Sequence, residues 1–218
     1  MARAIARRAA PGRCVCAVAA VALAAASCLP EPTRVDPVGV VVSGDPVQAP
    51  AEDLQPLRLT LDGTEYVLTP RARYVLRGVV VGCERYRVGW QAALAPYDVA
   101  MAWGPLAQNA TFRRLTWSQE NRWYFWRYRG DFGHDNEFVY RHSANTHVIP
   151  ANERVARAIR ALEFGAGAEL AGILVDVGAE RGGTRYWWNT SLSRGDSGDG
   201  SCEVLYLARI KVGQEVWE

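Results

Sequence analysis

The sequence predicts a mainly β, α+β domain, in the form of a small OB-like barrel or sandwich of about seven strands with one helix. Short segments that alternate apolar and polar residues recur from residue 57 to residue 210, and only one segment has helical spacing. An apolar run behind several arginines opens the chain. We therefore expect a signal peptide over residues 1–27, a Pro-rich tether over 28–56 and a single globular domain over 57–218.

The first 28 residues resemble a bacterial export signal. Arg3, Arg7, Arg8 and Arg13 precede a short apolar run, and small residues lead to Cys28. A lipoprotein signal places at this position the cysteine that is acylated after cleavage. The run spans about 16 residues, fewer than the roughly 20 that a membrane-spanning helix needs. We expect an exported protein held by a lipid anchor at the outer membrane or in the periplasm, with plain secretion and an uncleaved anchor as alternatives.

Removal of the signal changes the charge balance. Residues 1–27 contain four of the 25 basic residues and none of the 23 acidic ones, which leaves 21 basic and 23 acidic residues in the mature chain. A net charge near −2 argues against general electrostatic attraction to nucleic acid. The expected partners are the membrane, through the anchor, and an envelope protein or a glycan.

The segment that follows Cys28 is rich in proline. Six prolines lie between residues 29 and 56, with glycine and serine between them. Such a composition favours an extended spacer over a packed element. We expect this tether to lift the domain away from the membrane.

Strand patterns begin at residue 57. Residues 57–61 alternate leucine with polar residues, and Asp62-Gly63 predicts a hairpin turn into residues 66–68. Gly78 interrupts the next strand, which indicates a bulge or a close approach between backbones. Further strands are expected at 74–81, 97–103, 117–128, 169–177, 186–192 and 203–210. The glycine-interrupted segment 165–177 is similar to the coiled strand of OB-like barrels.

One helix is expected, over residues 153–162. Val155, Ile159 and Leu162 recur at positions i, i+4 and i+7, so they share one face. Asn152 stands in front of this segment and is a favoured N-cap residue. A single helix before the last three strands fits either a barrel or a sandwich covered by a helix.

Two cysteines remain in the predicted domain, Cys83 and Cys202. Two thiols in an oxidising compartment favour a disulfide, which would close a loop of roughly 120 residues and stabilise the fold by about 3–5 kcal/mol. The alternative is two separate buried thiols.

All three histidines, His134, His142 and His147, fall within one short stretch. Their clustering makes them candidate metal ligands, and a metal-assisted hydrolase that uses them is one alternative function. Their spacing matches no zinc motif, and histidines in a polar loop often cap helices or bind backbone groups instead. No cofactor is predicted.

Tryptophans and arginines alternate in two segments of the chain. Trp123, Trp126, Trp187 and Trp188 have the composition of a surface that stacks on a glycan or on single-stranded nucleic acid. Packing of these rings in the core is the alternative. If residues 123–128 form one strand, rings lie on both of its faces.

Three blocks, residues 98–105, 142–152 and 191–204, resemble a group of bacterial exported proteins of unknown function. The resemblance covers most of residues 66–210. It implies a single exported domain and assigns no catalytic or binding residue. The sequence therefore favours a non-catalytic binding or structural module of the bacterial envelope.

Overall fold

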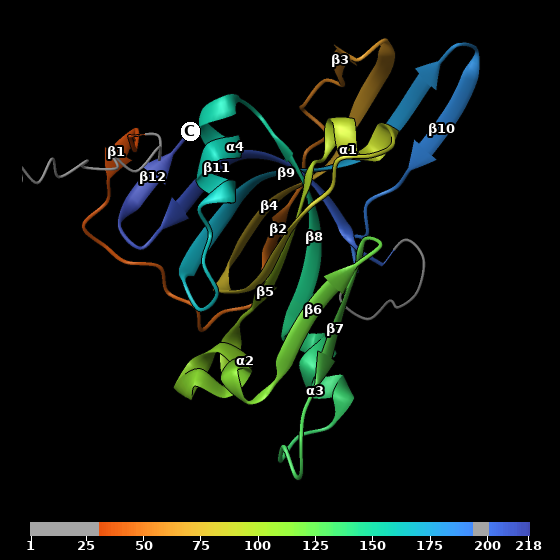
Figure 1. Ribbon diagram of the computed structural model, residues 1–218. Helices are drawn as coiled ribbons and strands as arrows, with labels where there is room; N and C mark the ends of the chain where they lie inside the picture. Colours follow the sequence, from red (N-terminus) through yellow and green to blue (C-terminus); the bar gives the residue numbers. More distant parts are fainter. Residues whose placement is uncertain (1–30, 194–200) are drawn as a thin grey trace, which may run out of the picture.

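The computed structural model describes residues 31–193 and 201–218, and it shows a twisted sheet with short helices around it (Figure 1). The expected mainly β, α+β class is confirmed. The signal segment and Cys28 lie outside the described residues, as do residues 194–200 of the last expected turn. Within the described part of the chain, no helix is long and apolar enough to cross a membrane.

The elements, in chain order, are β1 (Arg34–Val35), β2 (Val47–Ala49), β3 (Leu57–Leu61), β4 (Thr64–Arg85), α1 (Trp90–Leu94), β5 (Tyr97–Ala102), α2 (Gly104–Ala107), the 3-10 helix η1 (Gln108–Arg114), β6 (Thr116–Glu120), β7 (Trp123–Arg127), α3 (Asn136–Arg141), β8 (Ser143–Pro150), α4 (Glu153–Arg160), β9 (Gly167–Arg181), β10 (Thr184–Trp188), β11 (Glu203–Val212) and β12 (Glu215–Trp217). The described residues thus contain more strands and helices than the sequence predicts, because many of the additional elements are too short to show a period.

Five strands close into a ring of hydrogen-bonded pairs. Strand β4 pairs with β5, β5 with β8, β8 with β11, β11 with β9, and β9 with β4. Only the pair β8–β11 is parallel, and α4 forms part of the connection from β8 to β9. A five-stranded Greek-key barrel of this kind is the OB-like alternative of the sequence prediction.

Bulges and glycines allow the long strands to bend around this barrel. Strand β4 spans 22 residues and changes register with β9 after Pro70 and with β5 after Val80. A Cβ atom on Gly78 would lie 2.4 Å from the carbonyl oxygen of Ala102. The close approach expected at Gly78 is therefore confirmed, because only glycine fits there.

Apolar side chains fill the barrel, and α4 covers one end of it. Leu170, Leu174 and Leu205 are fully buried in the main core cluster. Val155 and Ile159 of α4 join the same cluster. The expected helix is confirmed, with the Asn152 side chain accepting a hydrogen bond from the Val155 amide at 2.9 Å, although the helix ends two residues earlier than predicted.

The segment expected to be a free tether packs along the barrel in its described part, residues 31–56. Strand β1 pairs with β12, and β2 pairs with β4. Trp103 Nε1 donates to Asp45 Oδ1 at 3.2 Å, and Lys211 Nζ donates to Asp36 Oδ2 at 2.7 Å. Strands β3 and β5 pair with the two ends of β4 along one edge and leave its middle unpaired. Strand β2 forms hydrogen bonds with part of this middle segment.

Residues 103–142 form an insertion between two barrel strands, β5 and β8. It contains α2, η1, α3 and a separate hairpin of β6 and β7, which extend below the barrel in Figure 1. The single strand predicted for 117–128 is therefore wrong. Asn121 and Arg122 form a two-residue turn with φ of 52° and 72°, and the sequence signal was weak because glycine usually occupies such a position.

Candidate functional site

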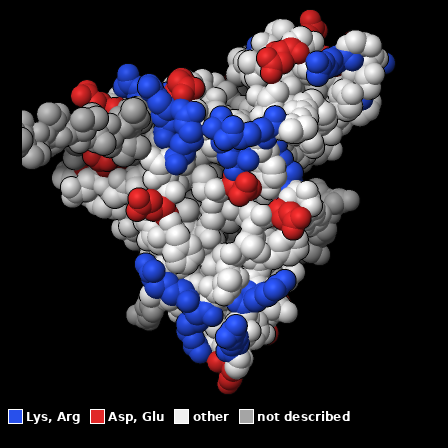
Figure 2. Space-filling model, viewed as in Figure 1, with Lys and Arg blue, Asp and Glu red and all other residues white. Residues whose placement is uncertain are grey.

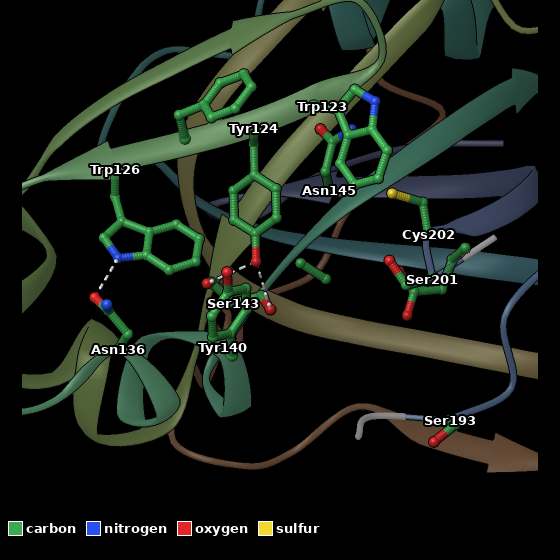
Figure 3. A pocket seen from close by; sticks show the side chains of 13 residues that line it. Trp123, Tyr124, Trp126, Asn136, Tyr140, Ser143, Asn145, Ser193, Ser201 and Cys202 are labelled. Carbon is green, nitrogen blue, oxygen red and sulfur yellow. Dashed lines mark hydrogen bonds between the residues drawn. The ribbon is translucent and has the colours of Figure 1, made fainter. Parts of the chain in front are cut away.

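A pocket of about 360 Å³ lies between the β6–β7 hairpin and the barrel (Figure 3). Strand β7, helix α3, the start of β8 and the residues around the start of β11 form its walls. The lining residues are Trp123, Tyr124, Phe125, Trp126, Asn136, Tyr140, Ser143, Ala144, Asn145, Ser193, Ser201, Cys202 and Glu203. The pocket therefore combines aromatic rings with hydroxyl and amide groups.

Strand β7 turns alternate rings toward and away from the barrel. Tyr124 and Trp126 are half-buried against it, whereas Trp123 and Phe125 are 37% and 49% exposed. The Trp126 ring meets the ring of Tyr140 edge-on, with centroids 4.6 Å apart. Aromatic rings from both faces of β7 thus line the pocket.

Helix α3 and strand β8 add polar groups to this aromatic wall. Trp126 Nε1 donates to Asn136 Oδ1 at 3.3 Å, and the hydroxyls of Tyr124 and Ser143 lie 3.2 Å apart (Figure 3). Ser143 also donates to the carbonyl oxygen of Val139 at 2.7 Å. These bonds fix the positions of the side chains that a ligand would meet.

Ser193, Ser201 and Cys202 approach the pocket from the opposite side (Figure 3). Among the described lining residues, Glu203 is the one carboxylate, and neither lysine nor arginine is present. A polar ligand with hydroxyl groups matches this composition better than an anionic polymer does.

A buried charged network holds the hairpin to the barrel. The Asp98 side chain is fully buried, and its Oδ1 lies 2.7 Å from Arg122 Nη1 and 2.8 Å from His147 Nδ1. Asn145 Nδ2 donates to the other carboxylate oxygen at 3.2 Å. The Arg122 guanidinium lies 4.0 Å from the ring centroid of Tyr86. Asp98 and Arg122 were missed as paired residues because packing of the β6–β7 turn against the barrel, and no local sequence signal, brings them together.

The three candidate metal ligands do not converge. The His134 ring stacks on Phe138 with centroids 3.8 Å apart, and His142 Nδ1 lies 2.7 Å from the Phe138 carbonyl oxygen. His147 faces Asp98 instead. Over residues 31–193 and 201–218, no group of three His, Cys, Asp or Glu side chains could hold a metal. The metal site predicted from sequence proximity is not formed, because α3 and the pleat of β8 separate the rings.

Cys83 and Cys202 are not joined by a disulfide, contrary to the sequence prediction. Cys83 lies on β4, and Cys202 directly precedes β11. In the barrel, β9 separates these strands on one side, and β5 and β8 separate them on the other. Two strand spacings amount to about 10 Å, beyond the roughly 7 Å between Cα atoms that a disulfide can bridge.

The four candidate tryptophans fall into two groups. Trp123 and Trp126 line the pocket, whereas Trp187 and Trp188 lie on β10 and do not. Trp187 is 71% exposed, and Trp188 packs edge-on against Trp90 with ring centroids 6.0 Å apart. The four tryptophans expected to form one binding surface thus lie in two places, and of these only Trp123 and Trp126 line the pocket.

The fold and the pocket define a small five-stranded barrel with a ligand-sized site on the outer face of β8. Ser143 and Asn145, two residues apart on β8, both line this site. No family model, curated protein or solved structure matches the chain. The chemistry of the pocket therefore carries the functional argument.

Proposed function

We propose that this protein is a saccharide-binding module of the bacterial envelope and that the aromatic pocket is its binding site. The observation that carries the proposal is the combination of ring surface and neutral polar groups in one cavity. A sugar ring has an apolar face of C–H groups and a rim of hydroxyls. Trp123, Trp126 and Tyr140 match the face, and Asn136 and Ser143 match the rim.

The size of the cavity supports a small ligand. Its volume of about 360 Å³ falls in the range of roughly 300–1,000 Å³ that is typical of small-molecule sites.

Two other candidate functions receive less support. Single-stranded nucleic acid requires a basic groove along its phosphates, and the described lining residues of the pocket include no basic side chain. A metal-assisted hydrolase requires ligands that converge, and the described histidines point to different partners.

The sequence supports an envelope location for this module. The arginine-rich n-region, the short apolar run and Cys28 together favour export and acylation. We expect Cys28→Ser to abolish labelling by a radioactive fatty acid and to release the protein from membranes or leave it unprocessed. Unchanged labelling and membrane partition would show that Cys28 is not the attachment site.

The saccharide site is tested on the protein carrying Cys28→Ser, to avoid aggregation through an acyl chain. A glycan array identifies bound saccharides, and calorimetry measures their affinity. Trp123→Ala should weaken binding about five- to 150-fold, since loss of one stacking ring costs about 1–3 kcal/mol. Trp187→Ala removes an exposed indole from another element and is the matched control.

Comparison of the two variants distinguishes a specific ligand site from non-specific binding to exposed aromatic rings. Affinity should remain within about twofold of wild type for Trp187→Ala. If the array shows no saturable binding, or if both variants weaken it equally, the pocket is not a saccharide site.

A further inference from the structure

A second pocket lies at the far end of the β6–β7 hairpin and outside the saccharide site. Its volume is about 530 Å³, and its described lining residues are Arg114, Thr116, Arg127, Tyr128 and Arg129. They come from the end of η1, the start of β6, and the end of β7 with the residues after it. Basic side chains gather at this lower end of the molecule in Figure 2.

Among the described residues, the three guanidinium groups have no carboxylate as an ion-pair partner. In the described part of the chain, no carboxylate lies within ion-pair distance of Arg114, Arg127 or Arg129. The pocket therefore concentrates three positive charges with no carboxylate among its described lining residues.

The acidic residues nearest in sequence are engaged elsewhere. Asp131 Oδ1 accepts from the Gly133 amide at 2.7 Å, and Asp135 Oδ1 caps α3 by accepting from the Phe138 amide at 2.8 Å. Glu137 accepts from Arg141 Nε at 2.8 Å. None of these three carboxylates forms an ion pair with Arg114, Arg127 or Arg129, so the guanidinium groups of the pocket are left to bind an external anion.

Two of the three arginines are held on ordered parts of the fold. Arg114 Nη2 donates to the carbonyl oxygen of Asp131 at 3.0 Å, and its guanidinium lies 5.4 Å from the ring centroid of the buried Phe132. Arg127 is the last residue of β7 and pairs with Thr116 of β6. Because the hydrogen bond and the ring contact restrain the Arg114 guanidinium, it loses less conformational entropy when it binds an anion.

We propose that Arg114, Arg127 and Arg129 form a binding site for a phosphate group. A phosphate presents three or four acceptor oxygens, enough for donors from all three arginines, whereas a carboxylate presents two. The hydroxyls of Tyr128 and Thr116 are further donors at the rim of the pocket. The site does not depend on the saccharide pocket, and either a soluble phosphate ester or an anionic lipid headgroup supplies the required group.

The test uses Cys28→Ser protein purified from the soluble fraction, so that neither an acyl chain nor a retained signal segment holds it to vesicles. The soluble probe is pyrophosphate, measured by calorimetry at low ionic strength. The lipid probe is a vesicle of phosphatidylglycerol in phosphatidylcholine, measured by co-sedimentation. The double variant Arg127→Gln/Arg129→Gln is compared with the control Arg58→Gln/Arg87→Gln. The control removes the same charge from two exposed arginines that form no ion pair with another described residue.

We expect the Arg127→Gln/Arg129→Gln variant to bind pyrophosphate at least about tenfold more weakly, and the control to remain within about twofold of wild type. If the protein also binds vesicles, if Arg127→Gln/Arg129→Gln weakens that binding, and if pyrophosphate competes with it, the phosphate group comes from a lipid headgroup. Pyrophosphate binding without vesicle binding identifies a soluble phosphate ester. Absence of saturable binding to either probe, or equal loss in the two variants, overturns the proposal.

Discussion

The imidazole of His147 and the carboxylate of Asp98 form a buried hydrogen bond, with Nδ1 and Oδ1 2.8 Å apart. The antiparallel register of β5 and β8 places these residues directly opposite each other. Arg122 reaches the same carboxylate oxygen from the hairpin turn. This buried charged contact is therefore one of the contacts that hold the hairpin carrying Trp123 and Trp126 to the barrel.

Loss of the Arg122 charge should strongly destabilise the protein. Arg122→Met keeps an unbranched apolar stem but removes the guanidinium, which leaves Asp98 as a buried carboxylate without this partner; we expect a cost of about 3–5 kcal/mol in chemical denaturation. Arg141→Met is the control, because Arg141 and Glu137 form an exposed pair worth at most about 1 kcal/mol. Similar small losses in both variants would show that the buried network does not hold the hairpin.

Gly172→Ala should disrupt closure of the barrel. A Cβ atom at this position would lie 2.0 Å from the carbonyl oxygen of Tyr206, where β9 approaches β11. We expect a loss of about 3 kcal/mol or more in the free energy of unfolding. Gly178→Ala tests the same strand where the added methyl meets nothing within 4 Å, and its effect should stay within about 1 kcal/mol. Equal stability of the two variants would contradict the close strand approach.

Trp126→Ala and Trp123→Ala should differ in stability. Trp126 packs against Trp117, Tyr124 and Tyr140, so its removal should cost about 3 kcal/mol. Trp123 is more exposed, and its removal should cost less than about 1 kcal/mol. Thermal unfolding measures the difference. Large losses in both variants would mean that both faces of β7 are buried.

Cys83 should be unreactive in the native protein. Burial raises the pKa of its thiol to about 12, so alkylation by iodoacetamide at pH 8, mapped by mass spectrometry, should modify Cys83 only after unfolding. Native, unreduced protein should also yield no peptide linked through a Cys83–Cys202 disulfide. Detection of that linked peptide would support the original sequence prediction instead.

The raised pKa of Cys83 also sets the direction of a pH dependence. An unfolded thiol ionises near pH 9, so between about pH 9 and 12 the unfolded state has lost a proton that the native state retains. The free energy of unfolding should therefore fall as pH rises through this interval. Cys83→Ala should reduce that slope by the contribution of one proton. An unchanged slope would show that the thiol ionises equally in both states.

Local signals in the sequence were sufficient for several elements. The Asp62-Gly63 turn joins β3 to β4 with both residues at positive φ, as predicted. The α4 helix begins after its Asn152 cap. These features depend on residues within a few positions of one another, so their physical chemistry is visible without the rest of the fold.

Predictions that required distant contacts were less successful. The histidines are close in sequence, yet His142 ends α3 while His147 turns toward Asp98. The described part of the predicted tether pairs with β4 and β12, because those strands leave edges that local composition does not reveal. The pocket itself was visible only as an excess of tryptophan around residues 123–126.

The sequence by itself determined the mainly β class, the main hairpin, the helix and the alternation of rings along β7, because strand and helix periods are properties of neighbouring residues. Only the tertiary structure decided which side chains meet: Trp126 with Tyr140, Asp98 with His147 and Arg122, and three arginines around one pocket. Strand register sets the contact between Asp98 and His147, and packing of the insertion of residues 103–142 sets the others. Both depend on how the whole chain folds and not on neighbouring residues alone.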